Sequence, residues 1–483
     1  MKDEASRGLT NPFGIDTRAL AALRIALGSI LFADLAARLT RIAADYSGDA
    51  AHPIERARAY LTMPFSLHLV DETAWYQGTL LGVAALAAAL LTAGFKTRWM
   101  TILSWYLLVS LHHRSYHIQD VGDQLLRLLL LWSIFLPMGR HYSIDARRSS
   151  RAPELIRSFG SVGMVLQVVV LYLSGFFHKL QGETWTTGEA LETVLQDDVW
   201  VQPLGALLLE IPSLPKALTF FTLAAELLGP LLLLSPFAAR RCRLVAVFFL
   251  TLFTLGIGTS LQLGVIPWVA GSALLPFLPT ATWDRLDRKV GAPSEAAEPL
   301  RGSRAGKLIT NIIAAVFLVQ MLVSTVDSFL KPSKLPLEVR QAISALGLDQ
   351  AWGMYAPDPV VSSYRVQVRL DLESGETVEL VLGSPRLGWP DGETLEPLEG
   401  FWNAYRGRML IDNIIYPELF ADLRPFLVWA CDQWNAAHPD RPTRSAGISK
   451  QLRDVRPAEY VPGRHYRLSG QQPLLGHICS EHR

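Results

Sequence analysis

Nine apolar segments occur along this chain, and each is long enough, or nearly so, to cross a hydrocarbon core about 30 Å thick. Backbone groups in lipid must find their hydrogen-bond partners internally, so the series predicts an all-α polytopic membrane bundle. The fourth and eighth segments are short, and the prolines of the eighth predict a tilted, broken or re-entrant helix. The segments are Leu20–Leu39, Tyr76–Phe95, Trp99–His117, Leu125–Leu136, Gly160–Phe177, Ala217–Phe237, Leu244–Leu263, Val265–Leu278 and Leu308–Phe329.

Composition agrees with a membrane location and excludes other classes of protein. Half of the 483 residues are hydrophobic and 18% are charged, which is too apolar for an ordinary soluble enzyme of this size. The net charge of +1 offers no basic surface for phosphates, so membrane lipids rather than nucleic acid are the expected partners. Met1–Asp16 lacks the plan of a cleaved signal peptide, and we expect the first apolar segment to be retained.

Lysine and arginine are concentrated in the loops between segments four and five, six and seven, and eight and nine. Short loops rich in these residues stay on the cytoplasmic side of a membrane. We therefore expect the N-terminus inside, everything after Phe329 outside, and a location in the bacterial inner membrane. The loop after the first segment argues against this orientation, because it contains Arg38, Arg41, Arg56 and Arg58.

The chain changes character near residue 331, where prolines and charges become frequent and apolar segments end. We divide it into a membrane domain, residues 1–330, and a small extracytoplasmic α+β domain, residues 331–483. Alternating residues over Tyr364–Leu370 and Thr377–Leu382 predict a β-hairpin. Leu423–Ala437 has the spacing of an amphipathic helix, with Asp422 as its N-cap. Outside the membrane, Cys431 and Cys479 could form a disulfide.

Charged residues within the apolar segments need partners, because a charge left in hydrocarbon costs about 2.5–3.5 kcal/mol or more. Arg24 and Asp34 are ten residues apart, roughly 15 Å along a helix, so we expect each to find partners on other helices. Glu226 lies in the middle of the sixth segment. For it, an interhelical hydrogen bond and a role in catalysis both remain open.

Polar residues are dense between the third and fourth segments. His113 and His117 have helical spacing, as do Asp123 and Arg127, which predicts an ion pair along one helix. A histidine pair of this kind can bind a metal, but no third ligand accompanies it, and the three cysteines lack the spacing of a zinc site. We therefore expect these residues to line a polar pocket, without a metal.

Lys179 follows His178 where the fifth apolar segment ends. Poor solvation at this place favours the neutral amine and would make it a usable base. The alternative is that the side chain extends to the lipid headgroups and takes no part in chemistry. The expected topology places the lysine on the outer side, where it would share one cavity with the histidine-rich loop. The candidate residues of this substrate pocket are His113, His117, Asp123, Arg127, His178 and Glu226.

Several pieces of the sequence together resemble the HTTM domain family, the membrane part shared with vitamin K-dependent γ-carboxylase. All of them lie within about the first 330 residues. They are Asn11–Asp16, Gly122–Leu128, Phe135–Gly139, Tyr142–Asp145, Tyr172–Trp185 with Gly188, and Leu274–Trp283.

The resemblance implies that Lys179 occupies the position of the catalytic base. In that family the amine deprotonates reduced vitamin K, and for this chain we expect reduced vitamin K or menaquinol. Oxidation of the quinol by O2 yields a strong base that removes a γ-proton from glutamate, and the carbanion captures CO2. The resemblance thus implies a carbon–carbon lyase that modifies a secreted peptide and uses no metal.

The sequence also departs from the carboxylase. Residues 331–483 are much shorter than the propeptide-binding region of the carboxylase, which leaves the substrate open. Leu348–Pro359 looks like part of the soluble protein that assists bacterial HTTM proteins in maturing secreted peptide toxins, and we interpret it as a docking loop. Two alternatives to the carboxylase-like enzyme therefore remain: a maturation or export factor for a secreted peptide, and a non-enzymatic membrane scaffold.

Overall fold

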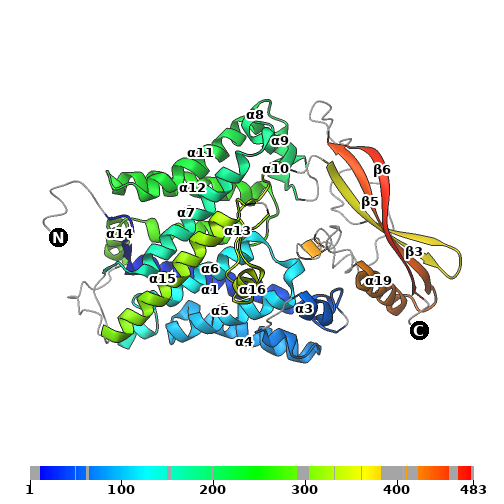
Figure 1. The fold of residues 1–483 in the computed structure, drawn as a ribbon, viewed down its shortest axis with the longest axis horizontal. Coiled ribbons are helices and arrows are strands. Elements are labelled where there is room, and N and C mark those ends of the chain that lie inside the picture. The colour runs from blue at the N-terminus through cyan, green and yellow to red at the C-terminus, as the bar shows by residue number, and fades with distance from the viewer. Residues whose placement is uncertain are drawn as a thin grey trace.

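The computed structural model describes residues 11–48, 50–60, 65–148, 154–196, 200–290, 304–330, 332–359, 362–381, 406, 409–410, 413, 423–455 and 466–479. These residues form a helical body and a smaller region built on a β-sheet (Figure 1). The sheet lies at the end of the molecule opposite α14 (Thr280–Val290).

A helix lies at each of the nine apolar segments. Among the described residues, six helices are long and apolar enough to cross a membrane: α1 (Thr17–Leu39), α4 (Ala74–Ala93), α7 (Phe159–Lys179), α11 (Leu214–Leu234), α12 (Ala239–Ser260) and α15 (Arg304–Asp327). The other three fall short of that standard, because one is rich in polar residues and two are short. They are α5 (Thr97–Arg114), α6 (Val121–Ile134) and α13 (Ile266–Ser272).

The eighth segment is a broken helix, one of the forms predicted from its prolines. After α13 the chain makes a short 3-10 turn, η4 (Leu275–Phe277), which contains Pro276. Pro267 lies in the first turn of α13, where its missing N–H costs no hydrogen bond. The broken helix packs against α12, α6 and α1 and so lies inside the body.

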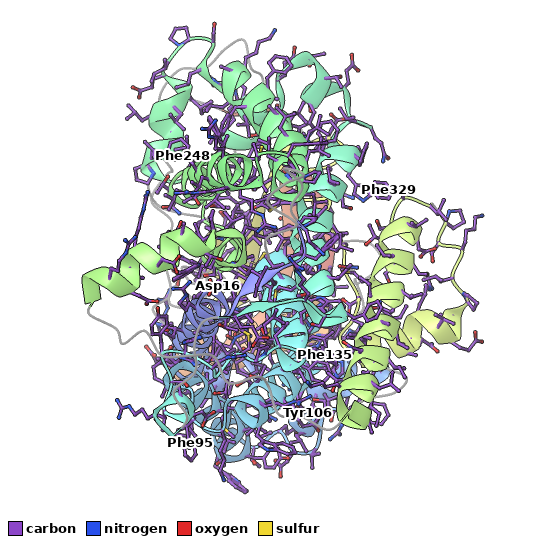
Figure 2. The ribbon with its side chains drawn as sticks, turned by 90° about the vertical axis from the view of Figure 1, so that its left-hand side faces the viewer. Asp16, Phe95, Tyr106, Phe135, Phe248 and Phe329 are labelled. Carbon is purple, nitrogen blue, oxygen red and sulfur yellow. A yellow bond between two sulfur atoms is a disulfide. The ribbon has the colours of Figure 1, made fainter. Side chains whose placement is uncertain are left out.

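Helix α7 lies at the centre of the bundle and contacts α6, α11 and α15. Seen from the α14 end, Phe248 of α12 and Tyr106 of α5 lie on opposite sides, with Asp16 between them (Figure 2). Helix α15 is the least buried of the six long helices and exposes large apolar residues such as Ile312, Val316 and Val319. We expect these side chains to contact lipid tails.

The C-terminal region contains one antiparallel sheet with the strand order β4-β3-β5-β6. Its strands are β3 (Ser362–Leu372), β4 (Thr377–Val381), β5 (Thr443–Val455) and β6 (Tyr466–Ile478). The pairing of β3 with β4 confirms the predicted hairpin, and helix α19 (Leu423–Ala437) confirms the predicted amphipathic helix. Its predicted cap, Asp422, lies outside the described residues.

Helix α19 covers β5 and β6 with buried side chains that include Phe426 and Trp434. A disulfide joins Cys431 of α19 to Cys479, directly after β6. The two cysteines are thus the pair suggested from the sequence, and they fix the helix to the edge of the sheet.

Candidate functional site

Lys179 is the last residue of α7, and its side chain points into the helical body. Helix α7 begins at Phe159, and the N-cap before it, Ser158, forms a capping box with Ser161. The Lys179 side chain is only 5% exposed, and its Nζ donates a hydrogen bond of 2.7 Å to Oε1 of Glu226 on α11. Nζ also lies 5.1 Å from the centre of the Trp185 ring, which favours a cation. The lysine is therefore held internally and does not extend to the headgroups.

One face of α7 is shaped to receive this ion pair. Tyr172, Gly175 and Lys179 recur at intervals of three and four residues, so they lie on the same side of the helix. A Cβ atom at Gly175 would lie 3.3 Å from Oε1 of Glu226. The glycine thus lets the carboxylate of the neighbouring helix approach α7 closely.

The ion pair opens onto a cavity of about 60 Å³. That volume holds a few waters or a molecule of similar size. Within the described residues, Oε2 of Glu226 and the hydroxyl of Tyr172 are buried polar atoms without a hydrogen-bond partner. The remaining walls are mostly apolar and are formed by Val121, Leu171, Gly175, Phe253, Thr254, Ile257, Ile266, Pro267, Ala270, Trp352 and Met354.

Two walls of the cavity, Trp352 and Met354, come from the Leu348–Pro359 loop. Gln350 fixes this loop between helices: its Oε1 accepts from Nε2 of Gln167 on α7, and its Nε2 donates to the carbonyl of Met321 on α15. The same Oε1 accepts from Nε1 of Trp352 at 3.2 Å. Gln350 therefore determines where the indole lies over the cavity.

The far end of the loop is attached to α8 (Glu183–Thr187). Nε1 of Trp185 donates to the carbonyl of Tyr355 at 2.8 Å. The carboxylate of Asp358 accepts from the backbone N–H and the hydroxyl of Thr184. Partial burial raises the pKa of Asp358, but these hydrogen bonds outweigh it and hold the pKa below its ordinary value.

Close contact at Gly182 also shows that the loop is docked. A Cβ atom built on this residue would lie 1.9 Å from the carbonyl oxygen of Pro357, so a larger side chain would displace the loop. The predicted docking of Leu348–Pro359 onto the membrane domain is thus seen in the structure. The loop also forms walls of the cavity, which the sequence did not suggest.

Asp123 lies in a second group of buried charges, apart from the cavity. Its Oδ1 accepts from Arg38 at 2.9 Å, and its Oδ2 accepts from Arg406 at 2.7 Å. Asp34 completes the group, with Arg38 at 2.7 Å and Arg406 at 2.6 Å. The burial of Arg406 lowers its pKa, but the two carboxylates outweigh that effect and hold the pKa well above its ordinary value.

Of the two predictions about charge pairing, one holds in part and one was wrong. Asp34 was expected to find partners outside its own helix and pairs with Arg406, but Arg38, one turn along α1, pairs with it as well. Asp123 and Arg127 do not pair with each other. Asp123 lies in the capping box of α6 and faces Arg38 and Arg406, whereas Arg127 pairs with Asp349 at 3.2 Å. His112 lies beside both side chains, with Nε2 3.7 Å from Oδ1 of Asp123 and Nδ1 3.3 Å from Nη1 of Arg127.

The histidines predicted to lie near Lys179 do not line its cavity. Helix α5 ends at Arg114, so His113 and His117 do not share a helix face. Nε2 of His113 lies 3.2 Å from the carbonyl of Ser344, and His117 packs edge-on against the ring of His52. His178 stacks on Phe329, with ring centres 4.1 Å apart. The described residues contain no cluster of three metal-ligating side chains.

Three residues of the two buried sites were not singled out from the sequence for the contacts they make. The hydroxyl of Tyr172 could have been suspected, because it lies two helical turns before Lys179. Trp352 had been assigned to docking alone. Nothing in the sequence around Arg406 indicated that it would be buried. Two buried aspartates, Asp34 and Asp123, need two cations, however, and Arg38 supplies one of them.

Comparison with known proteins gives one match. A family model of the HTTM domain covers residues 14–283, more than half of the chain. No curated protein and no solved structure matches. The matched range includes α7 and α11, and therefore both partners of the buried ion pair.

Proposed function

The chain belongs to the HTTM domain family, and from this premise we propose that it is an integral membrane enzyme of the vitamin K-dependent γ-carboxylase type. In this proposal Lys179 is the base that takes a proton from a reduced quinone, vitamin K hydroquinone or menaquinol. O2 and CO2 are the co-substrates, and a glutamate of a secreted peptide is the carbon acid. The site faces the outer side of a bacterial inner membrane, and the C-terminal region is extracytoplasmic.

The observation that supports this proposal best is the buried Lys179–Glu226 pair beside an apolar cavity. Such a pair is expensive to bury, because each charge loses its hydration. Snorkelling would have avoided that cost, since Lys179 is the last residue of its helix. Ionisable groups kept inside a membrane bundle at such a cost commonly act on protons or ligands.

The lining of the cavity fits the reactive end of a quinol in chemistry. Glu226 Oε2 can accept a hydrogen bond from a hydroxyl group, and the Tyr172 hydroxyl can donate one. The apolar residues around these two groups suit an aromatic ring. The volume of the cavity, about 60 Å³, is however far below the several hundred Å³ of a typical ligand pocket. Binding of a quinone ring therefore requires displacement of a wall, and Trp352 lies on a loop that can supply it.

The residues of this chain would perform three tasks. Lys179 and its carboxylate partner receive the hydroxyl proton, and the Trp185 ring stabilises the resulting ammonium group. The apolar walls exclude water and so strengthen every charge interaction inside the cavity. The quinol supplies the reducing electrons whose transfer to O2 generates the strong base for carboxylation.

The test is quinol oxidation by the purified full-length protein in lipid nanodiscs. We expect Lys179→Ala to lower turnover of vitamin K hydroquinone by at least about 100-fold, the usual contribution of a positioned base. Lys216→Ala, at an exposed position on α11, is the matched control and should keep full activity. Normal turnover by Lys179→Ala would remove the base assignment.

A second candidate, a maturation or export factor for a secreted peptide, is favoured by the four-stranded sheet at one end of the molecule. Mass spectrometry of secreted peptides from cells with and without the protein separates the two functions. A gain of CO2 on glutamate supports the carboxylase-like enzyme. A change in peptide cleavage or secretion without that gain supports the maturation factor. If the secreted peptides are the same with and without the protein, the non-enzymatic membrane scaffold is the remaining alternative.

A further inference from the structure

We propose that Lys179 and Glu226 act together as a single base that shares one proton, held at rest as a neutral amine and a carboxylic acid, with the Tyr172 hydroxyl as the donor to the anion it produces. This inference rests on the proposed function for its substrate, a hydroxyl-bearing ring. It assigns to Glu226 and Tyr172 roles in the proton transfer that the family match does not provide.

The need for a shared proton follows from the contact itself. A lysine that donates a 2.7 Å hydrogen bond to a carboxylate holds three protons on its nitrogen and has no lone pair to offer. It can act as a base only after one of those protons has moved. Glu226 Oε1 is the acceptor in contact with it, so the proton's destination is the carboxylate.

Apart from the Trp185 ring, which favours the ammonium form, the surroundings favour the neutral form of this pair. The described contacts give Lys179 one hydrogen bond, to Glu226, and give Oε2 of Glu226 none. Phe253, Ile257 and Ile266 are among the apolar residues around the cavity. A charged pair without further hydrogen bonds receives little compensation for its lost hydration, whereas an amine and a carboxylic acid need much less.

Tyr172 completes the site because it lines the same cavity. The hydroxyl is buried and has no partner among the described residues, so it is free to donate to a ligand. A preorganised donor in a water-excluded cavity stabilises an oxyanion strongly. Tyr172 lies two turns before Lys179 on the same side of α7, so both residues line the cavity.

The protons balance in this scheme. At rest the amine of Lys179 is neutral and Glu226 holds a proton. The amine takes the hydroxyl proton of the ligand and becomes an ammonium group, and the ligand becomes an anion that accepts from this ammonium and from Tyr172. As the ammonium group forms, Glu226 releases its own proton to solvent and becomes the carboxylate that balances the ammonium charge. When product leaves, this carboxylate takes the extra proton from the ammonium group, and the neutral pair is restored.

Infrared difference spectroscopy tests the shared proton without any assay of activity. We expect the wild type to show the carbonyl band of a carboxylic acid, with a shift in D2O, that is absent from Glu226→Gln. The control Glu189→Gln removes an exposed carboxylate and should leave the band in place. If the wild type and Glu226→Gln have the same spectrum in this region, the proton stays on Lys179 and the proposal is overturned.

Quinol turnover then tests the catalytic role. Glu226→Gln should lose at least about 100-fold in activity and Glu226→Asp should recover part of it, because only aspartate can hold the proton. Tyr172→Phe should lose about 100-fold, the effect of removing one oxyanion donor, while Tyr106→Phe on α5 should lose nothing. Quinone binding by each variant confirms that the site is intact.

Two failures can be told apart. If the wild type oxidises no quinol, the proposed function fails, and the infrared band still decides whether the pair shares a proton. If the wild type is active and Glu226→Gln is equally active, the proposed function stands and the role of Glu226 is overturned.

Discussion

The region after residue 331 contacts the helical body at two places, and the two places differ in how completely their buried charges are paired. At the first, Arg406 binds Asp34 and Asp123, and every carboxylate oxygen of the two aspartates is hydrogen-bonded. At the second, the Leu348–Pro359 loop covers Lys179 and Glu226, where one carboxylate oxygen has no partner.

This difference in hydrogen bonding distinguishes a buried charge group that stabilises the fold from one that can bind a ligand. A charge group with all its hydrogen bonds made, as around Arg406, has nothing left to offer a ligand and serves to join two parts of the chain. A buried pair beside a cavity that leaves a polar atom without a hydrogen bond has lost hydration without replacing it. A bound ligand can supply the missing hydrogen bond. On this reasoning we assign stability to the first site and chemistry to the second.

The largest expected effect is that of Arg406→Ala. Removal of this cation leaves two buried carboxylates with one arginine between them, and breaking a buried pair in this way costs about 3–5 kcal/mol. The thermal midpoint in detergent should fall sharply. Arg369→Ala is the matched control, because its ion pair with Asp371 is exposed and contributes about 1 kcal/mol or less. Equal losses for the two variants would contradict the structural role of Arg406.

A smaller loss is expected at the second site. Lys179→Met leaves Glu226 buried, but this acid can hold its own proton, so the cost should be about 1–3 kcal/mol of unfolding free energy. The double variant Lys179→Met with Glu226→Leu should recover most of that loss, because an apolar pair fits an apolar cavity. Both variants should be inactive. A loss as large as that of Arg406→Ala would mean that the pair is structural.

The helices of the helical body could be predicted from the sequence because a helix in lipid needs a long run of apolar residues, which is visible in consecutive positions. A helix lies at each of the nine predicted segments, and α19 has the predicted bounds. Both could be predicted because hydrophobic periodicity depends only on residues close together in the sequence. Lys179 and Glu226 were both singled out because a charge in an apolar segment is conspicuous. Their pairing was not predicted, because 47 residues separate them and nothing local sets the rotation of α7 against α11.

Long-range partners and interrupted helices account for the errors. Asp123 was paired with Arg127 on helical spacing alone, whereas its partner Arg406 lies 283 residues away. The histidine pair failed because α5 ends at Arg114, and helix boundaries are the least certain part of a sequence prediction. Trp352 could not be placed over the cavity, since its position depends on Gln350 and on contacts with two helices.

The covering loop can be loosened without touching the ion pair. Gly182→Ala would place a Cβ atom 1.9 Å from the carbonyl oxygen of Pro357, so the loop must move, at a cost of about 1–3 kcal/mol. Lys179 should then react faster with an amine reagent, as measured by mass spectrometry. Gly82→Ala on α4 is the control, because open space surrounds its Cβ position, and it should stabilise the protein by about 1 kcal/mol. Unchanged Lys179 reactivity in Gly182→Ala would mean that the loop does not cover the amine.

The smallest expected effect is that of Asp358→Ala, which removes the carboxylate that caps α8 and costs about 1 kcal/mol. The folded-state pKa of Asp358 is lowered, so its stabilisation is complete above the ordinary aspartate pKa of about 4 and disappears as the pH falls through the folded-state value. The thermal midpoints of wild type and variant should therefore differ at pH 7 and converge in acid.

Glu183→Gln serves as the control, because it removes an exposed carboxylate from the same helix and leaves Asp358 in place. The difference in thermal midpoint between Glu183→Gln and the wild type should not show the pH dependence expected for Asp358→Ala. If the gap between wild type and Asp358→Ala stays constant from pH 7 into acid, the ionised carboxylate contributes nothing to docking. The loop would then be held by the Gln350 network and the Trp185 hydrogen bond alone, and its closure over Lys179 would not respond to pH through Asp358.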